Sequence, residues 1–317
     1  MHKIQADAVR PGRDIIALPT VIALWILIIT VTVVASPCVA AAKNLPCSRM
    51  PALMKGFLSN HYAMKSLSDE IKSQAVEQLI KSIDPSKTLL YASDVQWLKP
   101  VLNDLFSAML SGNCASLTPL YDMLVDRAAE NEETVKKLLQ ADYRPDESLE
   151  LQIDARKRSY AKTRAEKQIL LKKFVQFQIE NALLNGIGLA QARQKQIHHY
   201  ELQTRRVKER EPEKLVTIAA EAFARALDPH TSYLSAESYE DLQIQMQLSL
   251  EGIGAILSND NGFTVIEEMI PGGGAEASGL LKPKDKIIAV AQENQKPVDV
   301  IDMDLRDVVR MIRGKKG

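Results

Sequence analysis

Aromatic residues are scarce in this chain: tryptophan, tyrosine and phenylalanine together make up 5% of its 317 residues. Proteins that stack the bases of single-stranded nucleic acids need several aromatic side chains on one surface, so the composition does not favour that class. Neither sign of charge is in excess, because 40 lysines and arginines balance 40 aspartates and glutamates. The sequence therefore lacks the basic surplus of a nucleic-acid binder and predicts no long-range attraction of a charged partner.

The long apolar run of the sequence lies near the N-terminus, at residues 15–35. Three lysines and arginines precede it, and small residues follow it before Lys43. This pattern is typical of an export signal that is cleaved after Ala41 or Ala42. The run also approaches the roughly twenty residues that span a bilayer, so an uncleaved membrane anchor is the main alternative. A buried core helix is a weaker alternative, because the run is terminal and the stretch after it is rich in proline and alanine. The signal and the anchor interpretations both assign residues 1–42 to export, and they predict membrane contact only through this segment.

Cysteine is rare, and Cys47 and Cys114 are the two cysteines that remain after the export segment. In an oxidising compartment such a pair favours a disulfide, with two separate buried thiols as the alternative. Two widely spaced cysteines without a nearby histidine do not form a zinc site. His198 and His199 are adjacent and point to different faces of a helix, so they do not form one either. The sequence predicts no metal site and no cofactor.

Apolar residues recur at intervals of three and four from about residue 50 to residue 246, which is the period of amphipathic helices. Ile71, Val76 and Leu79 show this spacing clearly. Proline and glycine positions interrupt the pattern, so we expect about six to eight packed helices in a domain over residues 43–246.

Residues 154–173 are dense in lysine and arginine, but acidic residues interleave with them. A nucleic-acid surface is one interpretation; we favour a helix with a solvated basic face. Its buried stripe is predicted to consist of Ile169, Leu170, Phe174 and Phe177.

Two similar segments, 83–90 (IDPSKTLL) and 227–234 (LDPHTSYL), each follow an amphipathic helix. An Asp-Pro pair ends a helix, so both segments are interpreted as structural turns. Asp228 and His230 are two residues apart in the second turn, and no nucleophile is marked beside them, so they are not assigned to catalysis.

The pattern changes at about residue 248, where short alternating segments replace the helical period. The predicted elements are a hairpin turn at 259–262, a return strand at 263–270, a short helix at 275–278 closed by Gly279, a strand at 286–290 and a helix at 305–313. The fold class is therefore α+β: a large all-helical domain, followed by a small β-rich domain over residues 247–317.

The segment LSLEGIGA, residues 248–255, brackets a turn with glycines just before an apolar strand. Such a turn can present bare backbone N–H groups to the carboxylate at the end of a peptide. The edge of the strand beyond it can pair with the peptide backbone. The segment therefore predicts a device that binds peptide ends.

The order of these elements resembles a PDZ domain in the permuted arrangement of carboxy-terminal processing proteases. The motifs that carry the resemblance are LDPHTSYL (227–234), LSLEGIGA (248–255), PGG (271–273), KDKI (284–287) and DVVRMIRGKKG (307–317). Their succession after a long helical region is similar to the tail-specific protease, or Prc, family, with its helical N-terminal domain and a PDZ domain.

The resemblance implies a periplasmic serine endopeptidase whose PDZ domain recognises the apolar C-terminal tail of a protein substrate, and whose serine is activated by a lysine. An adaptor lipoprotein is a further partner that such proteases can have. Gly252, Ile253 and Gly254 match the carboxylate-binding turn. The candidates for the apolar groove and its walls are Leu250, Ile256, Leu305, Val308, Val309 and Ile312. For each of these apolar residues, packing in the core of the domain is the equal alternative.

Two positions depart from the family pattern. Lys284 stands where a turn usually has glycine, so we expect a strained or shifted turn, and Gly274 stands where proline is frequent. No catalytic serine-and-lysine segment is recognised before Gly317, nor is the strand that would complete the PDZ sheet. The expected role is therefore substrate recognition in the N-terminal portion of such a protease, with no residue assigned to catalysis. The alternatives are an exported PDZ scaffold or adaptor without enzyme activity, and an inactive remnant.

Overall fold

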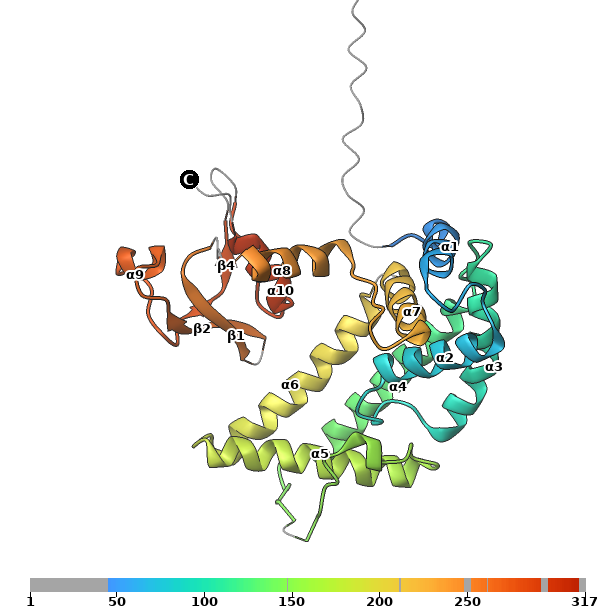
Figure 1. Cartoon of the computed structure of the whole chain (residues 1–317). Coiled ribbons are helices and arrows are strands. Elements are labelled where there is room, and N and C mark those ends of the chain that lie inside the picture. The colour runs from blue at the N-terminus through green and yellow to red at the C-terminus, as the bar shows by residue number, and fades with distance from the viewer. Residues whose placement is uncertain are drawn as a thin grey trace, which may run out of the picture. The chain divides into compact units, whose positions relative to one another are not determined.

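The structure is a computed structural model that describes residues 45–146, 148–210, 212–247, 252–260, 262–291 and 296–313. A long series of helices precedes a small region with strands, so the predicted α+β fold class is confirmed (Figure 1). Residues 1–42, to which the export signal or anchor was assigned, lie outside the described residues.

Eight α-helices occupy the described part of the chain up to residue 247, within the predicted range. They are α1 (Met50–Asn60), α2 (Asp69–Ile83), α3 (Ala92–Met109), α4 (Leu117–Leu138), α5 (Arg164–Leu184), α6 (Leu189–Lys208), α7 (Pro212–Leu227) and α8 (Ala236–Gln247). Two short 3-10 helices, η1 (Cys47–Arg49) and η2 (Ala155–Lys157), accompany them. No helix in the described ranges has both the length and the apolar character needed to cross a bilayer.

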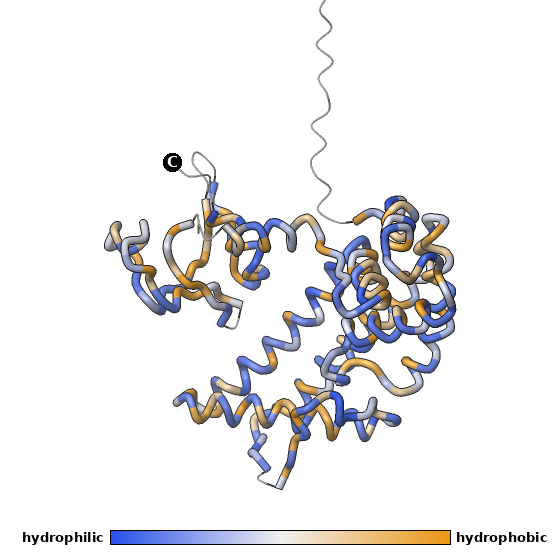
Figure 2. Tube along the Cα trace, in the orientation of Figure 1, coloured by the Kyte–Doolittle hydropathy of each residue, from blue (hydrophilic) through white to orange (hydrophobic). Residues whose placement is uncertain are grey.

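Two hydrophobic clusters stabilise these helices. The larger one joins α1 to α4 with α7, and α2 lies along α7. Leu79, Phe106 and Phe223 are fully buried in it. The smaller cluster joins the C-terminal part of α4 with α5 and α6. Figure 2 shows hydrophobic residues recurring between hydrophilic ones along the helices, and burial of this apolar surface drives their packing.

Helix α5 corrects one prediction from the sequence. It begins at Arg164, because the hydroxyl of Thr163 accepts a hydrogen bond from the N–H of Glu166 at 3.2 Å and caps the helix. The predicted buried stripe is wrong, since Ile169 and Phe177 are exposed. The buried residues of the helix are Lys167, Leu171, Val175, Gln176 and Ile179.

Both Asp-Pro segments end a helix, as predicted: α2 ends at Ile83 and α7 at Leu227. In the first turn the aspartate itself organises the backbone. The buried carboxylate of Asp84 accepts hydrogen bonds at 2.9 to 3.0 Å from the N–H groups of Thr88, Leu89 and Leu90. It thereby satisfies donors that the turn would otherwise leave unpaired.

The second region contains two small antiparallel sheets. Its elements are β1 (Ala255–Asp260), β2 (Phe263–Met269), α9 (Gly274–Ser278), β3 (Lys286–Ile287), β4 (Ala289–Val290), β5 (Val298–Asp299) and α10 (Leu305–Ile312). The sheets have the orders β1-β2-β3 and β4-β5. The predicted hairpin is confirmed, because Asp260 pairs with Phe263 across the turn. The strand predicted at 286–290 is split at Ile288, so that β3 joins the first sheet and β4 the second.

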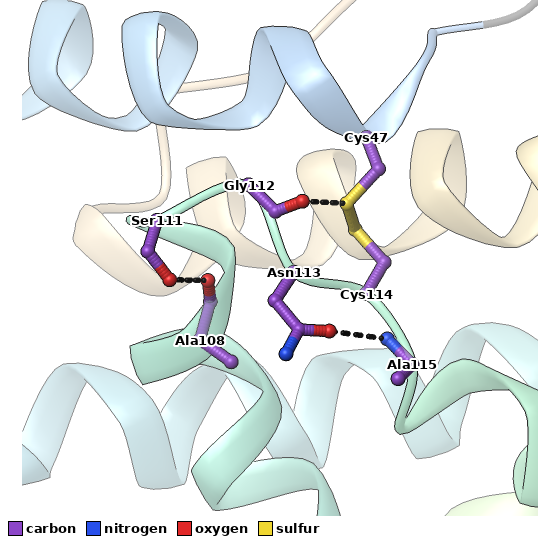
Figure 3. The surroundings of a disulfide bond; sticks show 7 residues. All are labelled: Cys47, Ala108, Ser111, Gly112, Asn113, Cys114 and Ala115. Atoms are coloured by element: carbon purple, nitrogen blue, oxygen red, sulfur yellow. Dashed lines mark hydrogen bonds between the residues drawn. A yellow bond between two sulfur atoms is a disulfide. The ribbon is translucent and has the colours of Figure 1, made fainter.

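A disulfide joins Cys47 to Cys114 (Figure 3). Cys47 begins η1, just before α1, and Cys114 lies between α3 and α4. The Cα atoms are 6.1 Å apart, and Cys47 Sγ lies 3.2 Å from the carbonyl oxygen of Gly112. Gly112 has φ +79°, which lets the chain turn tightly beside the bridge. The disulfide therefore fixes the start of α1 to the connection between two core helices.

Candidate peptide-binding site

The glycine loop 252–254 leads directly into β1. Gly254 has φ +74°, and a Cβ atom on it would lie 2.6 Å from the Cα of Gly273. Glycine is required there for both its conformation and this close approach of two backbone segments. Leu250, which was also assigned to the site, lies outside the described residues.

Two carbonyl groups of this loop accept backbone hydrogen bonds, whereas its N–H groups have no backbone acceptor among the described residues. The N–H of Ala275 donates to the carbonyl oxygen of Ile253 at 2.7 Å, and the N–H of Ile270 donates to that of Gly254 at 2.9 Å. Within the described ranges, the N–H groups of residues 252–254 have no hydrogen-bond acceptor. Successive free N–H groups in a turn form a concave site for an anion such as a carboxylate.

Strand β1 continues the site as an edge strand. In the sheet order β1-β2-β3, one side of β1 pairs with β2, and the other side has no partner strand among the described residues. Helix α10 packs against β1 and β4 (Figure 1). An exposed strand edge offers unpaired N–H and carbonyl groups, to which an extended peptide can add as a further strand.

The apolar residues assigned to the groove differ in their burial. Val308 is fully buried and therefore belongs to the core of this region. Leu305, Val309 and Ile312 are half-buried and lie at positions i, i+4 and i+7 of α10, which places them on one face. Ile256 on β1 is 50% exposed. These four residues keep surface that a ligand can cover.

Arg313 lies close to the loop and was not identified from the sequence. It follows α10, and its N–H donates to the carbonyl oxygen of Val309 at 2.9 Å. Its Cγ lies 4.0 Å from the point that a Cβ on Gly252 would occupy. The base of the Arg313 side chain thus lies near Gly252. Only the tertiary fold brings residues 252 and 313 together, so the local sequence carried no signal for it.

The Asp228 turn forms a separate polar cluster in the helical region. Asp228 Oδ2 lies 2.7 Å from His61 Nε2, and it accepts a hydrogen bond from Thr231 Oγ1 at 2.5 Å. The Thr231 hydroxyl, the N–H of His230 and the His61 ring hold the pKa of Asp228 well below its usual range. These partners all stabilise the carboxylate. Among the described residues, no three side chains gather as ligands for a metal ion.

Comparisons with known proteins give the family of this chain. Residues 53–237 match the family model of the tail specific protease N-terminal domain, and residues 241–317 match that of the PDZ domain. The chain is 30% identical over 259 residues to the tail-specific protease of Haemophilus influenzae, a match that covers 81% of this chain and 37% of the relative. It is 35% identical over 106 residues to the carboxy-terminal processing protease CtpA of Bacillus subtilis, covering 33% of this chain and 22% of the relative.

A solved structure is also similar: the PDZ domain of the carboxy-terminal protease from Vibrio cholerae in complex with peptide. It is 46% identical, the match covers 22% of this chain and 69% of that chain, and the TM-score is 0.21. The matches to the Haemophilus and Bacillus proteases cover less than half the length of those proteins. The match to the N-terminal domain alone extends over more than half of the chain. The chain belongs to the tail-specific protease family, and it contains that family's N-terminal domain and a PDZ domain.

Proposed function

We propose that this chain is the substrate-recognition portion of a carboxy-terminal processing serine endopeptidase, and that its PDZ domain binds the free, apolar C-terminal tails of protein substrates. The observation that carries the proposal is strand β1, which packs beside α10 and has one edge without a partner strand among the described residues. It starts at a loop whose N–H groups have no backbone acceptor in the same described ranges. The tail adds to the edge of β1, while its terminal carboxylate accepts hydrogen bonds from the N–H groups of residues 252–254.

The side chain at the end of the tail meets the apolar surface of Ile256, Leu305, Val309 and Ile312. Removing this surface from water favours binding by about 25 cal/mol per Å² of apolar area. Arg313, whose Cγ lies near Gly252, is proposed to extend its positive charge towards the carboxylate and so to strengthen the attraction at short range. Specificity for a free C-terminus follows from the carboxylate, and preference for apolar ends follows from these side chains.

We propose that a serine and a lysine, the residues that the family uses, cleave the bound substrate. None of the 317 residues is assigned to that step. The purified chain is accordingly expected to bind tails without hydrolysing them. Cleavage of an unstructured protein by the pure chain, sensitive to a serine-protease inhibitor, would contradict this division of roles.

We further propose that the chain is exported to the periplasm, with residues 1–42 as the signal or residues 15–35 as a retained anchor. The disulfide between Cys47 and Cys114 supports an oxidising compartment. N-terminal sequencing of the protein from a periplasmic fraction distinguishes cleavage after Ala41 or Ala42 from retention. An adaptor lipoprotein in that compartment is a proposed second partner.

The decisive experiment is a titration of the purified chain with a fluorescent peptide that ends in free Ala-Ala, beside the same peptide amidated at its C-terminus. We expect the free peptide to bind at least about tenfold more tightly, because amidation removes the charged acceptor of several N–H groups. Equal binding of the two peptides, or no binding by a folded sample, would contradict tail recognition.

A further inference from the structure

Helix α6 carries a row of basic residues that contact the PDZ domain. Lys195, His198 and Arg205 are three and seven residues apart, a spacing that places them on one face of the helix. Lys195 Nζ lies 2.7 Å from Asp260 Oδ1. His198 Nε2 lies 2.9 Å from one carboxylate oxygen of Asp302, and an Nη atom of Arg205 lies 2.5 Å from the other.

The two aspartates mark the ends of the elements that flank the proposed peptide site. Asp260 is the last residue of β1, and Asp302 lies in the loop that precedes α10. The N–H of Asp302 donates to the carbonyl oxygen of Gly262 at 2.7 Å, which ties this loop to the β1–β2 turn. Arg206 adds a hydrogen bond at 3.4 Å to the carbonyl oxygen of Met303. Helix α6 therefore holds one end of β1 and one end of α10.

Asp302 is the central residue of this contact. Its backbone has φ +63°, a left-handed conformation that aspartate adopts more readily than most residues other than glycine. Burial opposes ionisation of this carboxylate, but the hydrogen bonds from Arg205 and His198 outweigh that effect and hold the pKa of Asp302 below its usual value. The side chain is 21% exposed, so solvent screens its ion pairs less than those of a fully exposed group.

We propose that Lys195, His198 and Arg205 are positioning residues for the peptide site, because they hold β1 and α10 at the separation that a bound tail requires. The inference rests on the peptide binding proposed above and adds that the helical domain sets its affinity. A site that is already ordered loses less conformational freedom when the ligand binds. Removing these three side chains frees the ends of both elements and weakens binding.

The test compares the 317-residue chain with its triple variant Lys195→Gln/His198→Gln/Arg205→Gln. Fluorescence titration with the Ala-Ala peptide gives the dissociation constant, and hydrogen exchange followed by mass spectrometry reports the order of residues 301–312. We expect the variant to bind about three- to tenfold more weakly and to exchange faster in that segment. Raising NaCl from about 50 to about 500 mM should narrow the difference in affinity, because salt screens the ion pairs of the unmodified chain.

Two further variants control this comparison. Lys157→Gln/Lys162→Gln removes two positive charges from exposed positions of the helical domain, and we expect it to leave affinity and exchange unchanged. Lys195→Asp should weaken binding, and the double variant Lys195→Asp/Asp260→Lys should restore it by reversing the ion pair. This reversal is also the test if the triple variant fails to fold.

The outcomes separate this inference from the function on which it rests. If the unmodified chain binds the peptide and the folded triple variant binds it equally well, the positioning role is overturned and tail recognition stands. Unchanged hydrogen exchange in the variant, or failure of the reversed pair to restore binding, overturns it as well. If the unmodified chain does not bind the peptide, both proposals fail together.

Discussion

At Gly254 the peptide site depends on the absence of a single methyl group. A Cβ there would overlap the backbone of Gly273, and the φ of +74° is disfavoured for alanine. We expect Gly254→Ala to displace the loop and to weaken binding of a free-ended peptide by at least about tenfold. Titration with the Ala-Ala peptide measures this loss.

Gly252 provides the matched control in the same loop. A Cβ on Gly252 would make an ordinary contact, 4.0 Å from the Cγ of Arg313, and its φ is not positive. Gly252→Ala should therefore change the dissociation constant by less than about twofold. If the two variants bind the Ala-Ala peptide with equal affinity, the glycine loop is not part of the binding site.

Lys167 is a lysine in the interior of the helical domain, with only 2% of its side chain exposed. Its Nζ donates to the carbonyl oxygen of Leu89 at 2.6 Å and lies 3.7 Å from Glu130 Oε2. The ammonium group also lies 4.3 Å from the ring centroid of Tyr91. Burial nevertheless lowers the pKa of Lys167 to about 8, because it disfavours the charged form more than these partners favour it.

The pH dependence of stability follows from this lowered pKa. Between about pH 8 and the ordinary lysine value of 10.5, the unfolded chain holds a proton that the folded chain has lost, so stability rises with pH. We expect the free energy of unfolding of the unmodified chain, minus that of Lys167→Met, to increase by about 2 kcal/mol from pH 7.5 to 9.5. Urea unfolding at each pH measures it. The exposed control Lys157→Met should give a constant difference, and a constant difference for Lys167→Met would disprove the assignment.

Among the structural elements, the turn between α9 and β3 places a lysine in a left-handed backbone conformation. Lys284 has φ +74°, and its N–H donates to the carbonyl oxygen of Ile266 at 2.6 Å, which ties the turn to β2. Its ammonium group forms an ion pair with Glu267. The lysine thus adopts the left-handed conformation for which glycine is the usual residue.

Glycine at position 284 should therefore be more favourable than alanine. Both Lys284→Gly and Lys284→Ala lose the ion pair with Glu267, but only glycine relieves the left-handed backbone. We expect the glycine variant to be more stable than the alanine variant by about 1 kcal/mol. Thermal unfolding of the two proteins measures the difference. A more stable alanine variant would show that the turn is not strained.

Elements with strong local signals were predictable from the sequence. The turn around Gly262, the short helix closed by Gly279 and the amphipathic helix from Leu305 all occur where the pattern placed them. The break at Ile288 was not predictable from the sequence. Residues 287–290 are all apolar, and which sheet each of them joins depends on strands elsewhere in the chain. The buried face of α5 was missed because Lys167 occupies a core position that polarity alone assigns to solvent.

The sequence predicted which backbone loop forms the candidate site, but it did not predict which side chains surround that loop. Glycine spacing pointed to the loop at residues 252–254, since few residue types tolerate its conformation. Burial separates Val308 from its half-buried neighbours on α10, a distinction that helical periodicity does not contain. Arg313 and the contacts of α6 come from parts of the chain that only folding brings near the loop.

At the scale of the whole molecule, the disulfide constrains the chain over a sequence separation of 67 residues. In the chain-entropy account, closing a loop of this length stabilises the fold by about 4 kcal/mol relative to the reduced unfolded chain. We expect Cys47→Ser/Cys114→Ser to lower the free energy of urea unfolding by that amount. Dithiothreitol should reduce the stability of the unmodified chain to the same level and leave the variant unaffected. Stability that does not respond to the reductant would contradict this role.

The same bridge changes what a single backbone cut does to the protein. A nick anywhere between Cys47 and Cys114 leaves both fragments covalently joined, so α2 and α3 cannot diffuse away. Tethered fragments meet at a high effective concentration and can reassemble around the same core. For a member of a protease family, a cut in this segment therefore leaves a protein whose fragments can stay folded together. A cut beyond Cys114 releases a fragment that this disulfide does not hold.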